Sequence, residues 1–157
     1  MRRKDKEVLD EKIINEILTK SEFCRIAIND YEYPYLVPLN YGYCDNALYF
    51  HSAAEGKKIE LLKKNNKVCF EIEHTAKTIL NETPGKSTTK YLTVIGYGEI
   101  EIITDTNEKI KGLDIIMSHY SNNGNNEYNQ GQVNNLVILK LNINSLTAKR
   151  SGNWDQP

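Results

Sequence analysis

Apolar and polar residues alternate along much of the chain, with the period of two that is typical of β-strands. In residues 23–29, Cys24, Ile26 and Ile28 fall on one side. In the longer segment 91–103, Gly96 and Gly98 share one side. Glycines so placed indicate strong curvature or the close approach of another backbone. Strands are expected at residues 23–29, 34–44, 47–51, 67–73, 91–103 and 136–143.

The segment 34–44 is expected to be a single strand that contains Pro38. Proline has no backbone N–H to donate, so this strand should have a free edge or a bulge at Pro38. Asp45-Asn46 predicts a tight turn after it. We therefore expect residues 34–44 to form a hairpin with residues 47–51, with free backbone groups along the edge.

Helical spacing predicts three helices between the strands. Asp10 can cap the first, whose apolar face is Ile13, Ile14, Ile17 and Leu18. Ser52-x-x-Glu55 reads as a capping box, so the strand at 47–51 should change directly into a helix. Asp105-x-x-Glu108 reads as another, before a helix with the apolar face Ile110, Leu113, Ile116, Met117 and Tyr120.

Short connections between successive strands favour an antiparallel sheet, and the glycine-marked strand favours its closure into a barrel. The expected fold class is mainly β (α+β), six strands with flanking helices. One domain should span residues 1–157, with flexible tails at 1–9 and 148–157. Residues 74–90 are expected to form a polar loop, and the Asn-rich segment 121–135 a mobile loop that shapes substrate access.

Composition narrows the function only by exclusion. Lys+Arg 20 against Asp+Glu 21 gives a net charge of −1, which does not favour a nucleic-acid surface. The three cysteines form no C-x-x-C pair and the three histidines are scattered, so neither a disulfide framework nor a metal site is expected. No apolar run approaches the roughly 18 residues of a membrane span. We expect a cytoplasmic protein.

Lys57 and Lys58 stand at the start of the predicted second helix. A helix N-terminus carries about half a positive charge, and a cation there costs a few tenths to about 1 kcal/mol. An anion would reverse this, because free backbone N–H groups, the Ser52 hydroxyl and two ammonium groups make a phosphate site. The alternative is a solvated helix face on which Glu55 offsets the charge.

Four stretches of the sequence belong together: YPYLVPLNYGY, LYFHSAAEGKKIELLKKNNKVCFEI, TTKYLTVIGYGEIEII and IMSHY. In this order they resemble the pyridoxamine 5'-phosphate oxidase-like flavoproteins, most closely the nitroimidazole-resistance (Nim) group. The resemblance covers residues 23–143 and is most specific at FHSAAEGKK. It implies the FMN-binding split-barrel fold, a six-stranded antiparallel split β-barrel. It also implies a homodimer with FMN between the subunits.

Matched motif by motif, the resemblance assigns the FMN contacts. The residues Val37, Pro38, Leu39 and Asn40 would line the isoalloxazine ring through their backbone. His51, Ser52 and Ala53 would flank the ring, the ribityl chain and the phosphate. Lys57 and Lys58 would hold the phosphate.

Four further features bear on the chemistry. His51 could donate a proton to a bound substrate, or be satisfied by the backbone. Trp154 could stack on the partner subunit's flavin, or dock on an apolar patch. Thr147-Ala148-Lys149 stands where the family usually has Thr-Gly-Lys, so that contact is not carried over. The Arg-rich C-terminal motif of the pyridoxamine oxidases is absent, so vitamin B6 oxidation is not expected.

The expected function is that of an FMN-dependent oxidoreductase that reduces small aromatic or nitroaromatic compounds, with reduced nicotinamide or another electron donor. FMN would carry the redox chemistry and the protein would position it. One alternative is an FMN carrier or redox sensor without significant turnover. Another is a related haem-binding split barrel, for which His51, His74 or His119 could supply a ligand.

Overall fold

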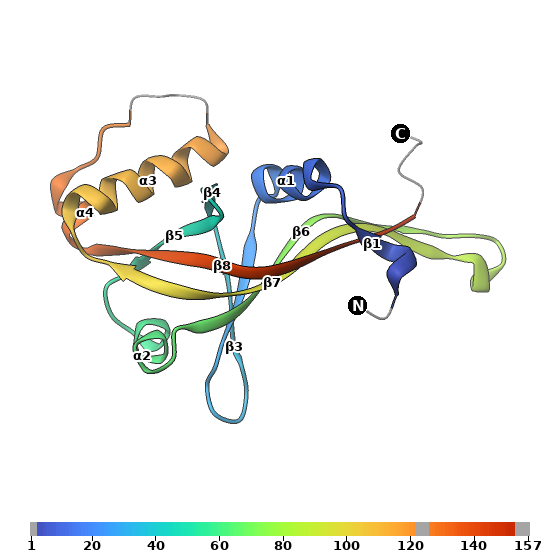
Figure 1. Cartoon of the computed structure of the whole chain (residues 1–157), viewed down its shortest axis with the longest axis horizontal. Coiled ribbons are helices and arrows are strands. Elements are labelled where there is room, and N and C mark those ends of the chain that lie inside the picture. Colours follow the sequence, from blue (N-terminus) through green and yellow to red (C-terminus); the bar gives the residue numbers. More distant parts are fainter. Residues whose placement is uncertain (1–2, 122–125, 153–157) are drawn as a thin grey trace.

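The alternating segments fold into one antiparallel sheet of eight strands (Figure 1). The computed structural model describes residues 3–121 and 126–152. The strands are β1 (Glu7–Val8), β2 (Cys24–Ile28), β3 (Tyr35–Leu39), β4 (Gly42–Cys44), β5 (Ala47–Ala53), β6 (Lys67–Ile79), β7 (Thr88–Ile103) and β8 (Leu136–Ser151). Their order is β3-β2-β6-β7-β8-β5-β4, with β1 paired to β8. The expected fold class is confirmed, with eight strands in place of six.

The sheet is a split barrel because its two ends are consecutive in the chain. Only Asn40 and Tyr41 separate β3 from β4, which lie at opposite ends of the strand order. In a flat sheet those ends would be roughly 29 Å apart at about 4.8 Å per strand, whereas the link reaches about 11 Å. The sheet must therefore curl until β3 and β4 approach. The prediction of a single strand at residues 34–44 is wrong, because at Asn40 the chain passes from one edge of the sheet to the other.

Gly96 and Gly98 of β7 allow this curvature. A Cβ on Gly96 would collide with the Phe70 ring, and a Cβ on Gly98 with the carbonyl oxygen of Asn142. The ladder between β7 and β8 shifts register between Tyr97 and Gly98. The close approach predicted from the two glycines is confirmed.

The inner face of the barrel is closed by aromatic side chains and by α1 (Glu11–Lys20). Tyr41 and Phe50 are fully buried, with ring centroids 6.5 Å apart. The Tyr41 hydroxyl donates to the Leu18 carbonyl at 2.9 Å, which ties the split between β3 and β4 to α1. The Asp10 side chain caps α1 as expected, by accepting from the Lys12 N–H.

The remaining helices lie outside the barrel. They are α2 (Lys57–Lys64), α3 (Thr106–Tyr120) and α4 (Gln130–Asn134), with short 3-10 turns at Lys4–Lys6 and Pro84–Lys86. Asp105 caps α3 as expected. The buried face of α3 is Lys109, Gly112 and Ile116, while Met117 and Tyr120 of the expected apolar face are exposed. None of the described helices is long and apolar enough to cross a membrane.

A ribbon projects from the barrel and is built from β6, β7 and β8, each of which extends beyond its expected range (Figure 1). Residues 74–79 continue β6 and residues 88–90 begin β7, so the polar loop expected at 74–90 is limited to 80–87. Strand β8 runs on to Ser151, and β1 pairs with it through Val8 and Ala148, both buried. The prediction of flexible tails is therefore wrong for residues 7–8 and 148–151, which belong to strands.

The segment 121–135 lies only partly within the described residues, since 122–125 fall outside them. In the remainder, Val133 of α4 is buried and the Tyr128 hydroxyl donates to Asp114 Oδ1 at 2.8 Å. The described part of the segment therefore includes a helix and packs on α3. Its mobility stays a prediction.

Candidate functional site

The end of β5 and the start of α2 carry most of the residues expected in the site. Alternation along β5 turns His51 and Ala53 outward and Ser52 inward, where only 6% of it is exposed. Pairing with β8 continues through Ala53, so the strand does not end at Ser52. Helix α2 begins only at Lys57, with Gly56 as its N-cap.

The capping box expected at Ser52-x-x-Glu55 is therefore wrong. Ser52 is still in the strand, and its side chain is buried on the inner face of the sheet. Gly56 has φ 104° and ψ 174°, a region open essentially only to glycine. No side chain of the described residues caps α2. Its first backbone N–H groups are left to water or a ligand.

Lys57 joins α2 to the hairpin between β2 and β3. Its Nζ lies 2.7 Å from Asp30 Oδ2 and 5.0 Å from the centroid of the Tyr35 ring. The hydrogen bond to Asp30 raises the pKa of Lys57, so the side chain is a cation. This contact brings the start of α2 beside β3.

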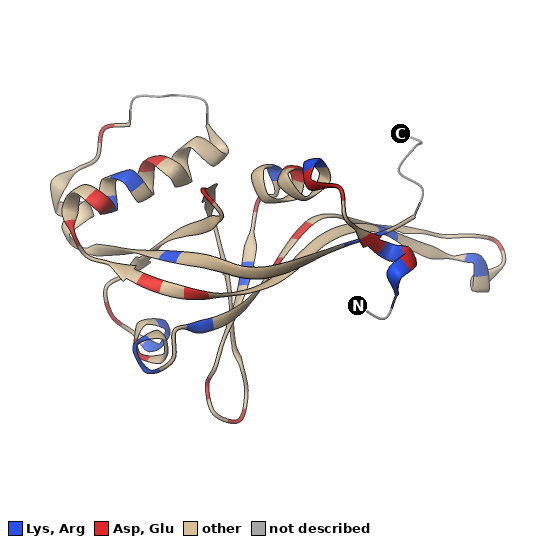
Figure 2. Cartoon of the chain, viewed as in Figure 1, with Lys and Arg blue, Asp and Glu red and all other residues tan. Residues whose placement is uncertain are grey.

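Lys58 differs from its neighbour in having no partner among residues 3–121 and 126–152. It is half-buried, and burial lowers the pKa of its ammonium group. Within the described part of the chain it forms no ion pair or hydrogen bond. Figure 2 shows that α2 carries several basic residues, and the sequence places lysines at both of its ends. A half-buried cation without a counter-charge, beside uncapped backbone N–H groups, is suited to an anion.

Strand β3 supplies the backbone edge of the site. Val37 and Leu39 pack against the core, whereas Pro38 and Asn40 are exposed. Strand β3 ends the strand order, so the free edge predicted at Pro38 is confirmed. Its partner is β2 and not β5, which pairs instead with β4. The expected hairpin is therefore limited to β4 and β5.

The structure thus places the expected residues on β3, the end of β5 and the start of α2. Asp30 and Tyr35, which touch Lys57, were not expected from the sequence. Asp30 and Lys57 are far apart in the sequence, and their contact depends on the path of the β2–β3 hairpin, which no local motif encodes. Trp154 lies outside the described residues.

The IMSHY stretch, residues 116–120, has a structural role. His119 Nε2 lies 2.7 Å from the Ser21 carbonyl oxygen, and the Tyr120 hydroxyl donates to the Glu22 carbonyl at 2.7 Å. The same hydroxyl accepts from the Tyr41 N–H at 2.9 Å. These contacts fasten the end of α3 to the split between β3 and β4.

The arrangement can bind an elongated ligand with an anionic end. The helix start and Lys58 suit a phosphate or carboxylate, since charge-assisted contacts are stronger than neutral ones. The free edge of β3 offers backbone donors and acceptors to a flat ring. His51 lies between β3 and α2 in the sequence. Its side chain is exposed and can therefore contact a ligand.

Comparison with solved structures agrees with this fold. A candidate 5-nitroimidazole antibiotic resistance protein from Bacteroides thetaiotaomicron is 33% identical, with a TM-score of 0.81 over 91% of this chain and 85% of that chain. A flavocytochrome from Azotobacter vinelandii is 13% identical, with a TM-score of 0.84 over 98% of this chain and 72% of that chain. The latter likeness concerns the fold alone.

No match was found among curated proteins. The sequence does match the pyridoxamine 5'-phosphate oxidase family over residues 10–150. This match includes every strand from β2 to β7 and most of β8. The chain therefore belongs to the pyridoxamine 5'-phosphate oxidase family.

Proposed function

We propose that the protein is an FMN-binding oxidoreductase that reduces small aromatic or nitroaromatic compounds. The observation that carries the proposal is the start of α2, where Lys57 and Lys58 stand beside uncapped N–H groups. The 33% identity to a candidate nitroimidazole resistance protein supports the substrate class.

The residues present fit FMN. Its phosphate would meet Lys58, Lys57 and the first N–H groups of α2, and its ring would lie along Val37–Asn40 of β3. Ser52 is buried, so its backbone, and not its hydroxyl, is the part available on the outer side. His51 would contact the ring or hold a proton for the substrate. When bound, FMN supplies the electron-transfer chemistry.

The proposed assembly is a homodimer. A row of cross-strand neighbours lies on the outer surface of the sheet, and we call it the outer sheet face. It consists of Leu36 of β3, Ala27 of β2, Cys69 of β6 and Tyr97 of β7. Leu36 is 60% and Tyr97 59% exposed. Exposed apolar residues gathered on one face are typical of an interface.

The proposed location is the cytoplasm, which the three free cysteines support.

The absorption spectrum of the purified protein tests the proposal. A flavin spectrum should appear, bleach on anaerobic addition of NAD(P)H, and recover when a 5-nitroimidazole is added. A flavin that never bleaches with any donor would favour the carrier or sensor. A protein that binds no FMN on titration would contradict the proposal.

A further inference from the structure

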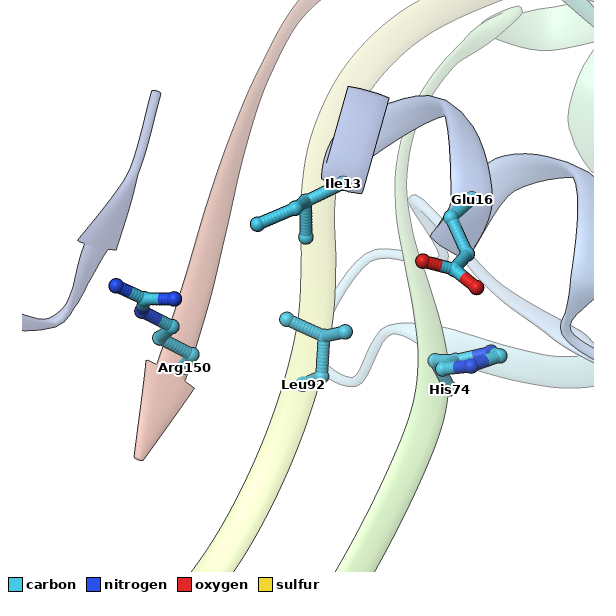
Figure 3. A pocket seen from close by; sticks show the side chains of 5 residues that line it. All are labelled: Ile13, Glu16, His74, Leu92 and Arg150. Atoms are coloured by element: carbon cyan, nitrogen blue, oxygen red, sulfur yellow. The ribbon is translucent and has the colours of Figure 1, made fainter. Parts of the chain in front are cut away.

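A cavity of about 280 Å³ lies away from the β3, β5 and α2 site, between α1 and the ribbon. Its lining is Ile13 and Glu16 of α1, His74 of β6, Leu92 of β7 and Arg150 of β8 (Figure 3). The volume is at the small end for ligand pockets. It suits a ligand with a single ring.

His74 reaches the cavity because of a bulge in β6. The ladder with β7 shifts register between Glu73 and Thr75, which leaves His74 unpaired. Bulges often re-aim a side chain beside a site. The Ser21 hydroxyl gives its one proton to the Ile17 carbonyl at 2.7 Å, so its 3.3 Å contact with His74 Nδ1 needs the proton on Nδ1. The neutral ring then has Nε2 as an acceptor.

The two ends of the cavity differ in charge. Glu16 lies near His74 at one end, and Arg150 lies at the other, with Ile13 and Leu92 between them (Figure 3). Glu16 Oε1 is bonded to Lys20 at 2.8 Å. Arg150 is the cross-strand partner of Leu92 and forms no ion pair with any described residue.

We propose that this cavity binds a small aromatic carboxylate that carries a hydroxyl group at its opposite end. The carboxylate pairs with Arg150, the ring packs between Ile13 and Leu92, and the hydroxyl donates to His74 Nε2 or Glu16. The proposal does not rest on FMN binding.

Calorimetric titration with 4-hydroxybenzoate tests the proposal on the FMN-loaded protein. Binding in the millimolar range or tighter is expected, and Arg150→Gln should weaken it about tenfold or more, because a charge-assisted contact is lost. Lys149→Gln removes the same charge from the other face of β8 and should leave binding unchanged. Equal weakening in both variants, or no binding to the wild type, would overturn the proposal.

Two analogues keep the test independent of folding. Benzoate lacks the hydroxyl and 4-hydroxybenzyl alcohol lacks the carboxylate, so both should bind the wild type more weakly than 4-hydroxybenzoate. The His74 Nε2 resonance should shift on titration. Equal affinity for all three compounds, or displacement of FMN by 4-hydroxybenzoate, would contradict a separate site of this chemistry.

Discussion

At the scale of single residues, Lys57 and Lys58 are adjacent but differently held. Lys57 has Asp30 as a counter-charge, whereas Lys58 has no partner among the described residues. Replacing both lysines by alanine should lower the affinity for FMN by roughly 10²-fold or more, because a charge-assisted contact contributes about 1.5–3 kcal/mol. Riboflavin, which lacks the phosphate, should bind almost unchanged. Titration of both ligands measures the difference.

Lys63→Ala/Lys64→Ala is the matched control, since it removes two lysines from the other end of α2. FMN affinity should change little in this variant. If Lys57→Ala/Lys58→Ala weakened FMN and riboflavin equally, the lysines would act on the fold. If it weakened neither, the solvated helix face would be the correct interpretation.

Tyr41 gives a second prediction at this scale. Burial raises the pKa of its hydroxyl, so the unfolded state ionises first, near pH 10. The stability that Tyr41 contributes is complete below that pH and falls as pH rises above it. Urea unfolding at about pH 8 and about pH 10.5 should show a smaller alkaline loss in Tyr41→Phe than in wild type. Tyr31→Phe, at an 89% exposed position, should behave as wild type.

At the scale of elements, the sequence predicts the existence of the strands better than the residues at which they begin and end. Alternation located β2, β5 and the middle of β6 and β7, because each buries one face. It missed the ribbon, where the end of β6 is exposed on both faces and no apolar period remains. It misplaced the buried face of α3 because Lys109 and Gly112, which lie on that face, are not typical apolar residues. The start of α2 was misread because Ser52 fits both a cap and a strand interior.

Gly56 carries the prediction at this scale. Its φ of 104° is strained for any other residue, although a Cβ there would meet nothing within 4 Å. Gly56→Ala should lower the free energy of unfolding by about 1–3 kcal/mol and weaken FMN by displacing the start of α2. Gly85→Ala is the control, since Gly85 also has open space but no positive φ. Urea unfolding of both variants compares them, and equal losses would contradict the assignment.

At the scale of the whole molecule, the outer sheet face is the proposed contact between two copies. Ala27 lies in it between Leu36 and Cys69. Ala27→Lys adds a charge that water can solvate in a monomer but that a dimer would bury, and burying an unpaired charge is costly. The variant should sediment as a monomer at micromolar concentration, where the wild type is expected to sediment as a dimer.

The same variant also tests whether the flavin site is shared. If FMN lies between the subunits, Ala27→Lys should weaken FMN as well as the dimer, although Ala27 is not among the residues assigned to the ligand. Ser118→Lys adds the same charge at an exposed position on α3 and should change neither. A wild-type protein that sediments only as a monomer with FMN bound would contradict the dimer, because one copy would then complete the site alone.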